Sequence, residues 1–238
     1  MNWFAKMFTS EDPPSTPNRM PLIATEKPAG EFKLDLGSRV ATVMNLYGYE
    51  YSTKPGEWEI IYVEGINTDG VLNDDAPNKF NDVRMVMSFA EEKPIIKGIW
   101  QATTEPGKLY TVRPVNHKGA ARIKFGQYEA WQVGMHRGNH EALVQTGGPV
   151  TVCRDLNKDY EREGDKEDTG YFGINQHRGY DSASDDIGSA SAGCFVGRTK
   201  KGHREFMVLV KSDSRYKSDP KFIFRTTILD GRDVDDVV

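Results

Sequence analysis

Apolar and polar side chains alternate along much of the chain, which is the pattern of β-strands that bury one face. The clearest case runs from Asp82 to Phe89, where every second side chain is apolar, and a charged turn then leads to a return strand at 95–100. So many short strands with few helices predict a mostly β fold, a sandwich or a barrel. Further strands are predicted at 58–63, 108–112, 121–125, 128–136, 142–145, 149–153, 171–176 and 221–229.

Two stretches instead repeat apolar residues at helical spacing. The first is predicted to have Ser38 as its N-cap and to end at Gly48, because glycine readily adopts the left-handed conformation that ends many helices. The second covers about 202–212, where Phe206 and Val210 share one face.

The chain divides by composition into three segments. Residues 1–35 are rich in proline, serine, threonine and charge, which predicts a poorly ordered leader or tether. A small β/α extension is expected at 36–80 and the main β-rich domain at 81–238. The apolar start of the leader is typical of a docking or frayed terminus, or of a short interfacial anchor. It does not read as a secretory signal, and no apolar run reaches the roughly 20 residues that a membrane-spanning helix needs.

Composition and charge narrow the class of protein. The 238 residues carry a net charge of −4, with 37% hydrophobic and 28% charged residues, which suits a soluble globular chain and argues against a nucleic-acid partner. Cys153 lies in a strand-like run and is interpreted as structural. Asp155 to Asp159 begins like a calcium loop but lacks the later ligands, and no cluster has zinc spacing, so no metal or organic cofactor is expected.

The candidate chemistry lies in the segment 171–196. A strand-like run delivers His177, and a loop rich in glycine, serine and aspartate then leads to Cys194. A thiol becomes a strong nucleophile only as the thiolate, and histidine is the side chain whose pKa suits a base near neutral pH. The small residues Ala192 and Gly193 leave backbone N–H groups open to a substrate carbonyl, as in an oxyanion hole. Taken singly, each would be an ordinary buried cysteine or hydrogen-bonded histidine.

His177 followed by a Ser-x-Gly-Cys motif that ends at Cys194 resembles the signature of the L,D-transpeptidase (YkuD-like) catalytic domain. A second stretch supports the likeness. The predicted hairpin of 82–100 precedes a T-E-P-G-K-L-Y-T segment, which is similar to that family's T-P-x-G-x-[FY] turn with Glu105 inserted. The resemblance covers roughly residues 80–230. It implies a β-rich sandwich or barrel of the L,D-transpeptidase catalytic type, with few short helices and an N-terminal extension.

The resemblance also implies a role for each matching residue. Cys194 would attack the carbonyl of a peptidoglycan stem peptide at meso-diaminopimelate. His177, oriented by the backbone carbonyl of Arg178, would take the thiol proton and later protonate the leaving amine. Gly193 and the cysteine itself would supply oxyanion donors, and Ser191 would shape the loop or bind substrate. The acyl-enzyme would then react with an amine, giving a cross-link, or with water, giving hydrolysis.

The chain departs from the family's pattern beside the cysteine. Ala192 stands where members often carry a second histidine, and Val196 stands where they often carry arginine. Arg178 and Arg198 are candidate binders of the substrate's carboxylates, since a guanidinium can pair with a carboxylate through two parallel hydrogen bonds. A solvated surface charge is the alternative for both, and it is favoured for Arg198.

A second His-Arg-Gly segment begins at His136, with His140 close behind. These histidines are candidates for the same cleft as His177, and His136 is a rival base for Cys194. The alternative, slightly favoured, is an exposed turn between two strands.

Three functions stay open on the sequence. The first is an acyltransferase that remodels peptidoglycan stem peptides through a Cys thioester. The second is a hydrolase at the same bond, an L,D-carboxypeptidase or endopeptidase of phage-lysin type, which the lack of an export signal favours. The third is a non-catalytic virion or envelope protein that kept the fold, favoured by Ala192 and by Asp185 and Asp186, because nearby negative charge raises the pKa of a thiol. Localisation is left open: synthesis in the cytoplasm is expected, with action at the cell wall, on a virion or at lysis.

Overall fold

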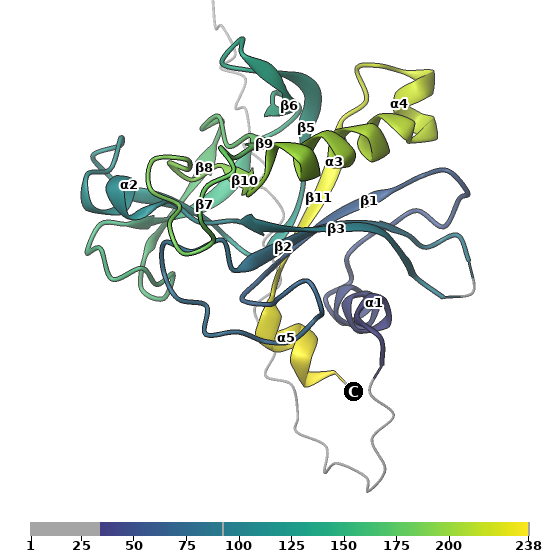
Figure 1. The fold of residues 1–238 in the computed structure, drawn as a ribbon, viewed down its shortest axis with the longest axis horizontal. Helices are drawn as coiled ribbons and strands as arrows, with labels where there is room; N and C mark the ends of the chain where they lie inside the picture. Colours follow the sequence, from purple (N-terminus) through teal and green to yellow (C-terminus); the bar gives the residue numbers. More distant parts are fainter. Residues whose placement is uncertain (1–33, 92, 238) are drawn as a thin grey trace, which may run out of the picture. The chain divides into compact units, whose positions relative to one another are not determined.

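The computed structural model describes residues 34–91 and 93–237, and within them eleven strands form two sheets, with five short helices around them (Figure 1). This confirms the prediction of a mostly β fold with few short helices. The predicted leader, with its alternative of an interfacial anchor, lies almost entirely outside the described residues. Within the described part of the chain, no helix is both long and apolar enough to cross a membrane.

The larger sheet is a closed barrel. Strands β1 and β11 run parallel in it, as do β9 and β10, whereas the other neighbouring strands are antiparallel. In order around the barrel the strands are β1 (Glu59–Glu64), β11 (Phe224–Asp230), β5 (Gly126–His136), β6 (His140–Gln145), β9 (Gln176–Arg178), β10 (Phe195–Gly197), β3 (Ile95–Thr103) and β2 (Asp82–Ser88).

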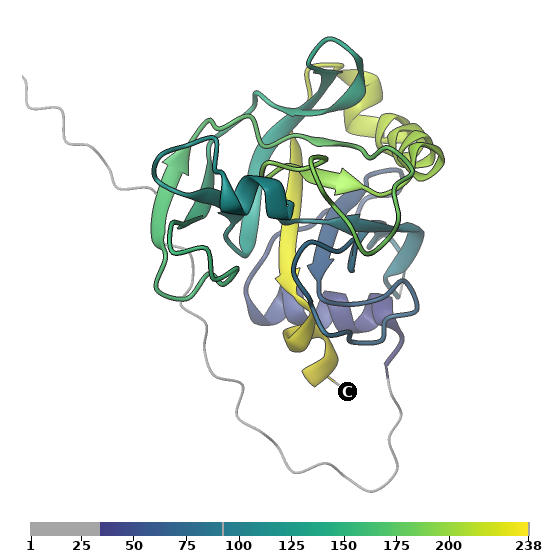
Figure 2. The ribbon, with the colours of Figure 1, turned by 60° about the vertical axis from the view of Figure 1, so that its left-hand side comes forward.

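The smaller sheet is antiparallel and consists of β4 (Ala120–Ile123), β7 (Val150–Asp155) and β8 (Lys166–Gly170). Figure 2 shows it to the left of the long strand β11. The helices are α1 (Leu36–Leu46), α2 (Lys108–Val112), α3 (Lys200–Ser212), α4 (Ser214–Ser218) and α5 (Gly231–Asp236).

The main core lies between barrel strands and helix α3. The ring of Phe195 packs 4.5 Å from that of Tyr62 and 5.7 Å from that of Trp131, measured between centroids. Phe206 and Val210 of α3 are buried in the same cluster, so the helix predicted at 202–212 is confirmed and the face it buries is the predicted one.

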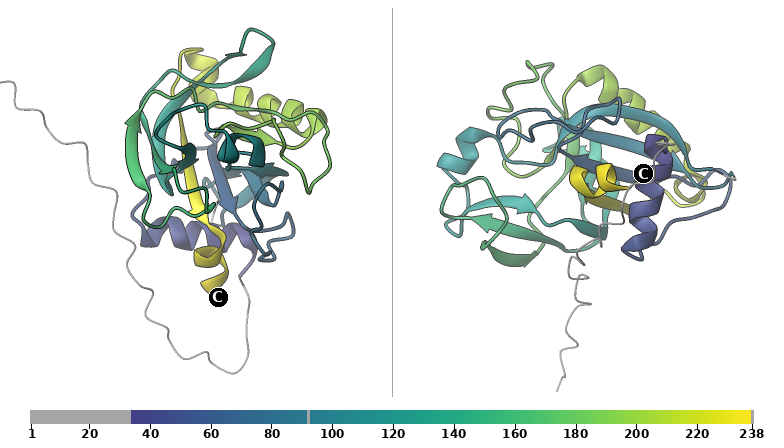
Figure 3. Two further views of the ribbon diagram at one scale, coloured as in Figure 1. Left: turned by 90° about the vertical axis from the view of Figure 1, so that its left-hand side faces the viewer. Right: turned by 90° about the horizontal axis from the view of Figure 1, so that it is seen from below.

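A second core cluster lies where α1 and α5, which are side by side (Figure 3), pack against strands β1, β2 and β11. Val40 and Met44 of α1 pack there with Val234 of α5. The predicted end of α1 is confirmed, since Gly48 follows the helix with φ of 66°. Its start was predicted wrongly: Asp35 is the N-cap, because its carboxylate accepts the Ser38 N–H at 3.0 Å.

Two predicted strands are wrong. Residues 108–112 form the helical turn α2, because Gly107 is its N-cap and the Gly107 carbonyl accepts the Tyr110 N–H at 2.9 Å. Of 171–176, only the last residue lies in a strand. The N–H groups of Phe172 and Ile174 donate to the side-chain amide oxygen of Gln145, at 3.1 and 2.9 Å, instead of to a neighbouring strand.

The boundary predicted between 36–80 and 81–238 is also wrong. Strand β1, on the N-terminal side of that boundary, lies between β11 and β2 in the barrel. The described residues, 34–91 and 93–237, accordingly belong to one compact unit. The extension is therefore part of the fold that carries the candidate site, because a barrel cannot close without one of its strands.

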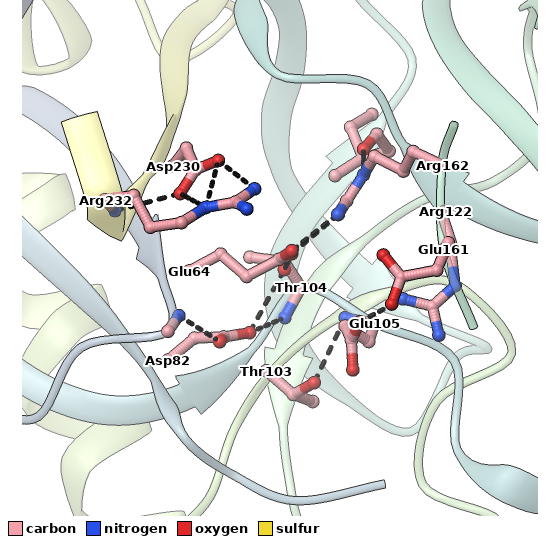
Figure 4. A network of polar contacts seen from close by, with 12 residues as sticks. Glu64, Asp82, Thr103, Thr104, Glu105, Arg122, Glu161, Arg162, Asp230 and Arg232 are labelled. Carbon is pink, nitrogen blue, oxygen red and sulfur yellow. Dashed lines mark hydrogen bonds and ion pairs between the residues drawn. The ribbon is translucent and has the colours of Figure 1, made fainter. Parts of the chain in front are cut away.

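A buried network of charged residues joins one end of the barrel to the smaller sheet and its connecting loop (Figure 4). Arg162, between β7 and β8, donates to Glu64 at the end of β1, with Nη2 2.6 Å from Oε2. Arg122 of β4 pairs with Glu105, which follows β3. Burial and the charge of Glu64 raise the pKa of Glu105 to about 7. Burial opposes ionisation of Glu64 as well, but the charge and hydrogen bonds of Arg162 outweigh it and lower the pKa of Glu64.

Candidate active site

Strands β9 and β10 place the predicted cysteine and histidine on one face of the sheet. Val196 pairs in register with His177, and paired residues of parallel strands point to the same face. Cys194 precedes Val196 by two residues, so the same alternation directs it to that face. Gln176 and Phe195, which are both fully buried, point to the other side.

Cys194 is a half-buried free thiol whose sulfur has two polar neighbours. Sγ accepts the Asn175 N–H at 3.5 Å and donates to the Gly173 carbonyl at 3.5 Å. Burial raises the pKa of the Cys194 thiol, and the Asn175 N–H only partly offsets this. Within the described residues no hydrogen bond joins Sγ to His177. The resting site therefore holds a neutral thiol, not a preformed thiolate–imidazolium pair.

His177 is held as a neutral imidazole with a defined tautomer. Its Nδ1 lies 2.8 Å from the carbonyl oxygen of Arg178, which is the contact expected from the sequence. A carbonyl only accepts, so Nδ1 carries the hydrogen and Nε2 carries the basic lone pair. Burial, with a smaller contribution from the nearby His136, lowers the pKa of His177 to about 3. The imidazole is therefore unprotonated at neutral pH and its Nε2 lone pair is available, although burial makes it a weaker base than an ordinary histidine.

The two further candidate histidines lie beside His177, and the favoured alternative of exposed imidazoles is wrong for His136, which is buried. The rings of His136 and His177 stack with centroids 4.0 Å apart, and His140 lies at 5.8 Å from His177 in an edge-on arrangement. Burial lowers the pKa of His136 to about 4. The structure therefore brings the two candidate bases, His136 and His177, into contact. Substitution of each histidine is needed to assign the base.

Asn175 is a positioning residue that sequence reasoning missed. Its backbone N–H contacts Cys194 Sγ, and its side-chain Nδ2 lies 3.0 Å from Nδ1 of His136. Its Oδ1 accepts the Gln145 N–H at 2.9 Å, which fixes the amide. A signal for it existed, because Asn175 precedes His177 by two residues and so shares its face in a strand.

The loop before Cys194 is held by Ser191. The Ser191 hydroxyl donates to the Cys194 carbonyl at 2.7 Å and accepts the Gly193 N–H at 3.1 Å. The Gly193 N–H is therefore occupied in the resting structure, and its role as an oxyanion donor stays a prediction. Gly193 has φ of 119°, and a Cβ there would lie 2.6 Å from the Ala121 carbonyl oxygen, so this position requires glycine. Ala192, half-buried beside it, has no contact that assigns it a role.

The two segments that carry the family resemblance meet in space. The N–H of Gly107, from the T-E-P-G segment, donates to the Ser191 carbonyl at 2.9 Å. A Cβ at Gly107 would collide with the Gly188 carbonyl oxygen, so the close approach depends on glycine. The turn thus supports the cysteine loop directly, although the two are far apart in the chain.

A groove of about 440 Å³ lies next to His140; Cys194, His177 and His136 are not among the residues that line it. His140 and Arg178 line it from the strands, and Lys200, His203 and Arg204 line it from α3. Its one carboxylate, Glu141, is already paired with Lys211 at 2.7 Å. The predicted carboxylate binder Arg178 therefore lies in a groove with excess positive charge. The other predicted binder, Arg198, lines a different cavity.

No metal site accompanies these residues. Within the described residues, no three histidine, cysteine, aspartate or glutamate side chains are placed to hold a metal ion. In the calcium-like stretch, the carboxylate of Asp155 instead accepts the N–H groups of Lys158 and Tyr160, at 2.6 and 3.2 Å, and so closes the hairpin turn. Cys153 is buried and free.

Comparisons of the chain with protein-family models, with curated proteins and with solved structures found no match. The likeness to L,D-transpeptidases therefore rests on the motif residues of the sequence alone.

Proposed function

We propose that this protein is a cysteine acyltransferase of the L,D-transpeptidase kind, acting on peptidoglycan stem peptides at meso-diaminopimelate. One observation carries the proposal: Cys194 and a neutral, tautomer-fixed His177 lie on the same face of two adjacent parallel strands. The support of the cysteine loop by the T-E-P-G segment adds to it.

The reaction begins when substrate displaces the thiol from the Gly173 carbonyl. Nε2 of His177 takes the thiol proton as Sγ attacks the peptide carbonyl, and the proton then passes to the leaving amine as a thioester forms on Cys194. Attack of an amine on this thioester gives a new amide bond and frees the Cys194 thiol. Attack of water gives a carboxylate and frees the same thiol. The hydrogen bond between Cys194 Sγ and His177 Nε2, which is absent from the described residues of the resting structure, forms on binding, because catalytic contacts often close only in the complex.

The groove beside the histidines suits the charge of such a substrate. Diaminopimelate carries a carboxylate on its side chain, and Arg178 and Arg204 line the groove with no ion pair of their own among the described residues. Because the Arg178 carbonyl also orients His177, binding at its guanidinium would be linked to the position of the base.

A second candidate is a non-catalytic envelope or virion protein with the same fold. The observation that favours it is the raised pKa of Cys194 together with the absence of a hydrogen bond to His177 among the described residues. A hydrolase of lysin type would use the same groups and differ only in its acceptor.

Product analysis on purified tetrapeptide muropeptides tests the proposal. The wild-type protein is expected to remove the terminal D-residue, and Cys194→Ala is expected to lose at least about 10³-fold in rate, because the nucleophile is gone. Cys153→Ala is the matched control, since it removes the other free thiol. Addition of an acceptor amine separates the alternatives: a cross-linked product identifies a transferase, and only shortened peptides identify a hydrolase. Identical products from wild type and Cys194→Ala would support the non-catalytic candidate.

A further inference from the structure

Asp82, at the start of strand β2, has a fully buried carboxyl group with no cation within ion-pair distance among the described residues. Its contacts are two backbone N–H groups and one hydroxyl. Oδ1 accepts the Gly65 N–H at 3.0 Å, and Oδ2 accepts the Thr104 N–H at 2.7 Å and lies 3.1 Å from the Thr104 hydroxyl oxygen. A buried carboxylate is costly without a cation beside it, so burial favours the neutral acid at Asp82.

The Thr104 hydroxyl lies between two carboxyl groups (Figure 4). It contacts Oε2 of Glu64 as well as Oδ2 of Asp82. A hydroxyl carries one hydrogen, so it donates to one of these oxygens, and the other contact needs a hydrogen from the carboxyl group. Glu64 holds Arg162 through both of its oxygens, with Nη2 2.6 Å from Oε2, and is therefore the anion. This leaves Asp82 as the group that carries the extra hydrogen.

The same two carboxyl groups face each other at the end of the ladder between β1 and β2. Val63 pairs with Val83, so the next pair along these antiparallel strands brings Glu64 opposite Asp82. Like charges directly opposite each other in a ladder are destabilising. A hydrogen on Asp82 removes this repulsion and turns the contact with Thr104 into a hydrogen bond.

The cations around Asp82 are directed to other groups. Arg162 pairs with Glu64 and Arg122 with Glu105, while the guanidinium carbon of Arg84 lies 3.9 Å from the ring centroid of Phe206. Burial, followed by the charges of Glu64, Asp75 and Glu105, raises the pKa of Asp82 well above its usual value. The charged groups on the elements packed around Asp82 are Glu64 of β1, Asp75 of the preceding loop, Arg84 of β2, Glu105 after β3, Arg122 of β4, Arg162 between β7 and β8, and Asp230 and Arg232 where β11 meets α5.

We propose that Asp82 holds a proton in the folded protein at neutral pH, and that loss of this proton loosens the T-E-P-G segment that supports the cysteine loop. The connection runs along the chain. Asp82 fixes the Thr104 N–H, and three residues later the Gly107 N–H donates to the Ser191 carbonyl at 2.9 Å. An ionised Asp82 would repel Glu64 and would have no hydrogen to give the Thr104 hydroxyl. The device does not depend on the proposed peptidoglycan activity.

The free energy of unfolding, measured by chemical denaturation between about pH 5 and about pH 8, tests for the proton. A group whose pKa is raised by folding stabilises the folded protein below its unfolded pKa, and this contribution is lost as the pH rises through the folded value. Each proton taken up on folding lowers the folding equilibrium constant about tenfold per pH unit, so Asp82→Asn should remove about that much from the slope of the wild type.

Asp74→Asn is the matched control for this slope. The Asp74 side chain is 70% exposed, and the Ala76 N–H lowers its pKa, so it is already ionised in the folded and the unfolded protein across this pH range. Its replacement should leave the slope unchanged. Equal slopes for the wild type and Asp82→Asn would overturn the proposal.

Carboxyl carbon NMR tests the same claim in the wild type, even if Asp82→Asn does not fold. The Asp82 resonance, assigned through its own Hβ protons, is expected at the chemical shift of a carboxylic acid at pH 7, and the shift of a carboxylate would overturn the proposal. As the pH rises through the titration of Asp82, the protection of the Thr104 and Gly107 N–H groups from hydrogen exchange should fall at least about tenfold more than that of the Tyr47 N–H at the end of α1. An equal change at all three would disprove the link to the cysteine loop. None of these results bears on the activity of Cys194.

Discussion

Replacing His177 with glutamine is expected to slow turnover of tetrapeptide muropeptides by about 10²–10⁴-fold, the range that a positioned general base contributes. Glutamine keeps the size and one donor of the side chain but cannot accept a proton at neutral pH. The loss should fall on kcat more than on KM, because the imidazole acts on the reacting atoms and not on the rest of the substrate.

Two other histidine variants serve as comparisons, one at the alternative base His136 and one at His117, outside the cluster. His136→Gln should have a smaller effect, because His136 is engaged at Nδ1 by Asn175. His117→Gln, outside the cluster, should have none. A loss in His136→Gln that exceeds the loss in His177→Gln would assign the base to His136.

The pH dependence of the wild type gives a further readout of the same prediction. Because the pKa of His177 is lowered to about 3, no inflection in kcat/KM is expected near 6.5. The rate should instead stay level between the lowered pKa of His177 and the raised pKa of Cys194, above its usual 9.0, because the reacting form combines a neutral imidazole with a protonated thiol. A limb with a midpoint near 6.5 would show that the essential base titrates as an ordinary histidine and would contradict this prediction.

Replacing Arg162 with methionine is expected to lower the free energy of unfolding by about 3–5 kcal/mol at pH 7, the cost of leaving a buried charge without its partner. Arg162 holds both carboxylate oxygens of Glu64 and donates from Nε to the Ile123 carbonyl at 2.8 Å. Its guanidinium also lies over the ring of Phe125. Chemical denaturation, followed by fluorescence, measures the difference.

The control for Arg162→Met is a surface pair on the same sheet. Lys124 and Glu167 form an ion pair with side chains 29% and 51% exposed, so Lys124→Met should change the free energy of unfolding by less than about 1 kcal/mol.

The destabilisation caused by Arg162→Met should also depend on pH. The pKa of Glu64 is lowered below 4.5 in the folded protein, so its contribution is complete above pH 4.5 and is lost as the pH falls through the lowered value. The penalty of Arg162→Met should therefore shrink in acid, and an unchanged penalty would contradict this account.

The strands that could be predicted from the sequence were those with two-residue periodicity, such as 82–89 and 128–136. The segment 171–175 has strand-forming residues but no strand, because the side chain of Gln145 takes the N–H groups that a neighbouring strand would have bonded. Local pattern carries no information on a competing acceptor that lies far away in the chain. The boundary at residue 80 failed for a related reason: β1 is completed by β11, from the other end of the chain.

In the candidate site too, local contacts could be predicted and contacts between distant segments could not. The contact between His177 and the Arg178 carbonyl is local and could be expected from the sequence. The hydrogen bond from the Gly193 N–H to the Ser191 hydroxyl depends on the conformation of the loop. The stacking of His136 on His177 depends on the pairing of strands that are distant in the chain. The spacing of residues in the sequence specifies neither. Nothing in the local sequence sets Arg122 and Arg162 apart, and they are largely enclosed because the two sheets meet around them.

Intact-mass spectrometry of the protein mixed with a purified disaccharide tetrapeptide tests the central claim most directly. The account predicts a covalent adduct on Cys194 equal in mass to the acyl fragment, absent from Cys194→Ala and released by an acceptor amine. Conversion of the substrate at the same rate by Cys194→Ala, with no adduct on the wild type, would contradict it.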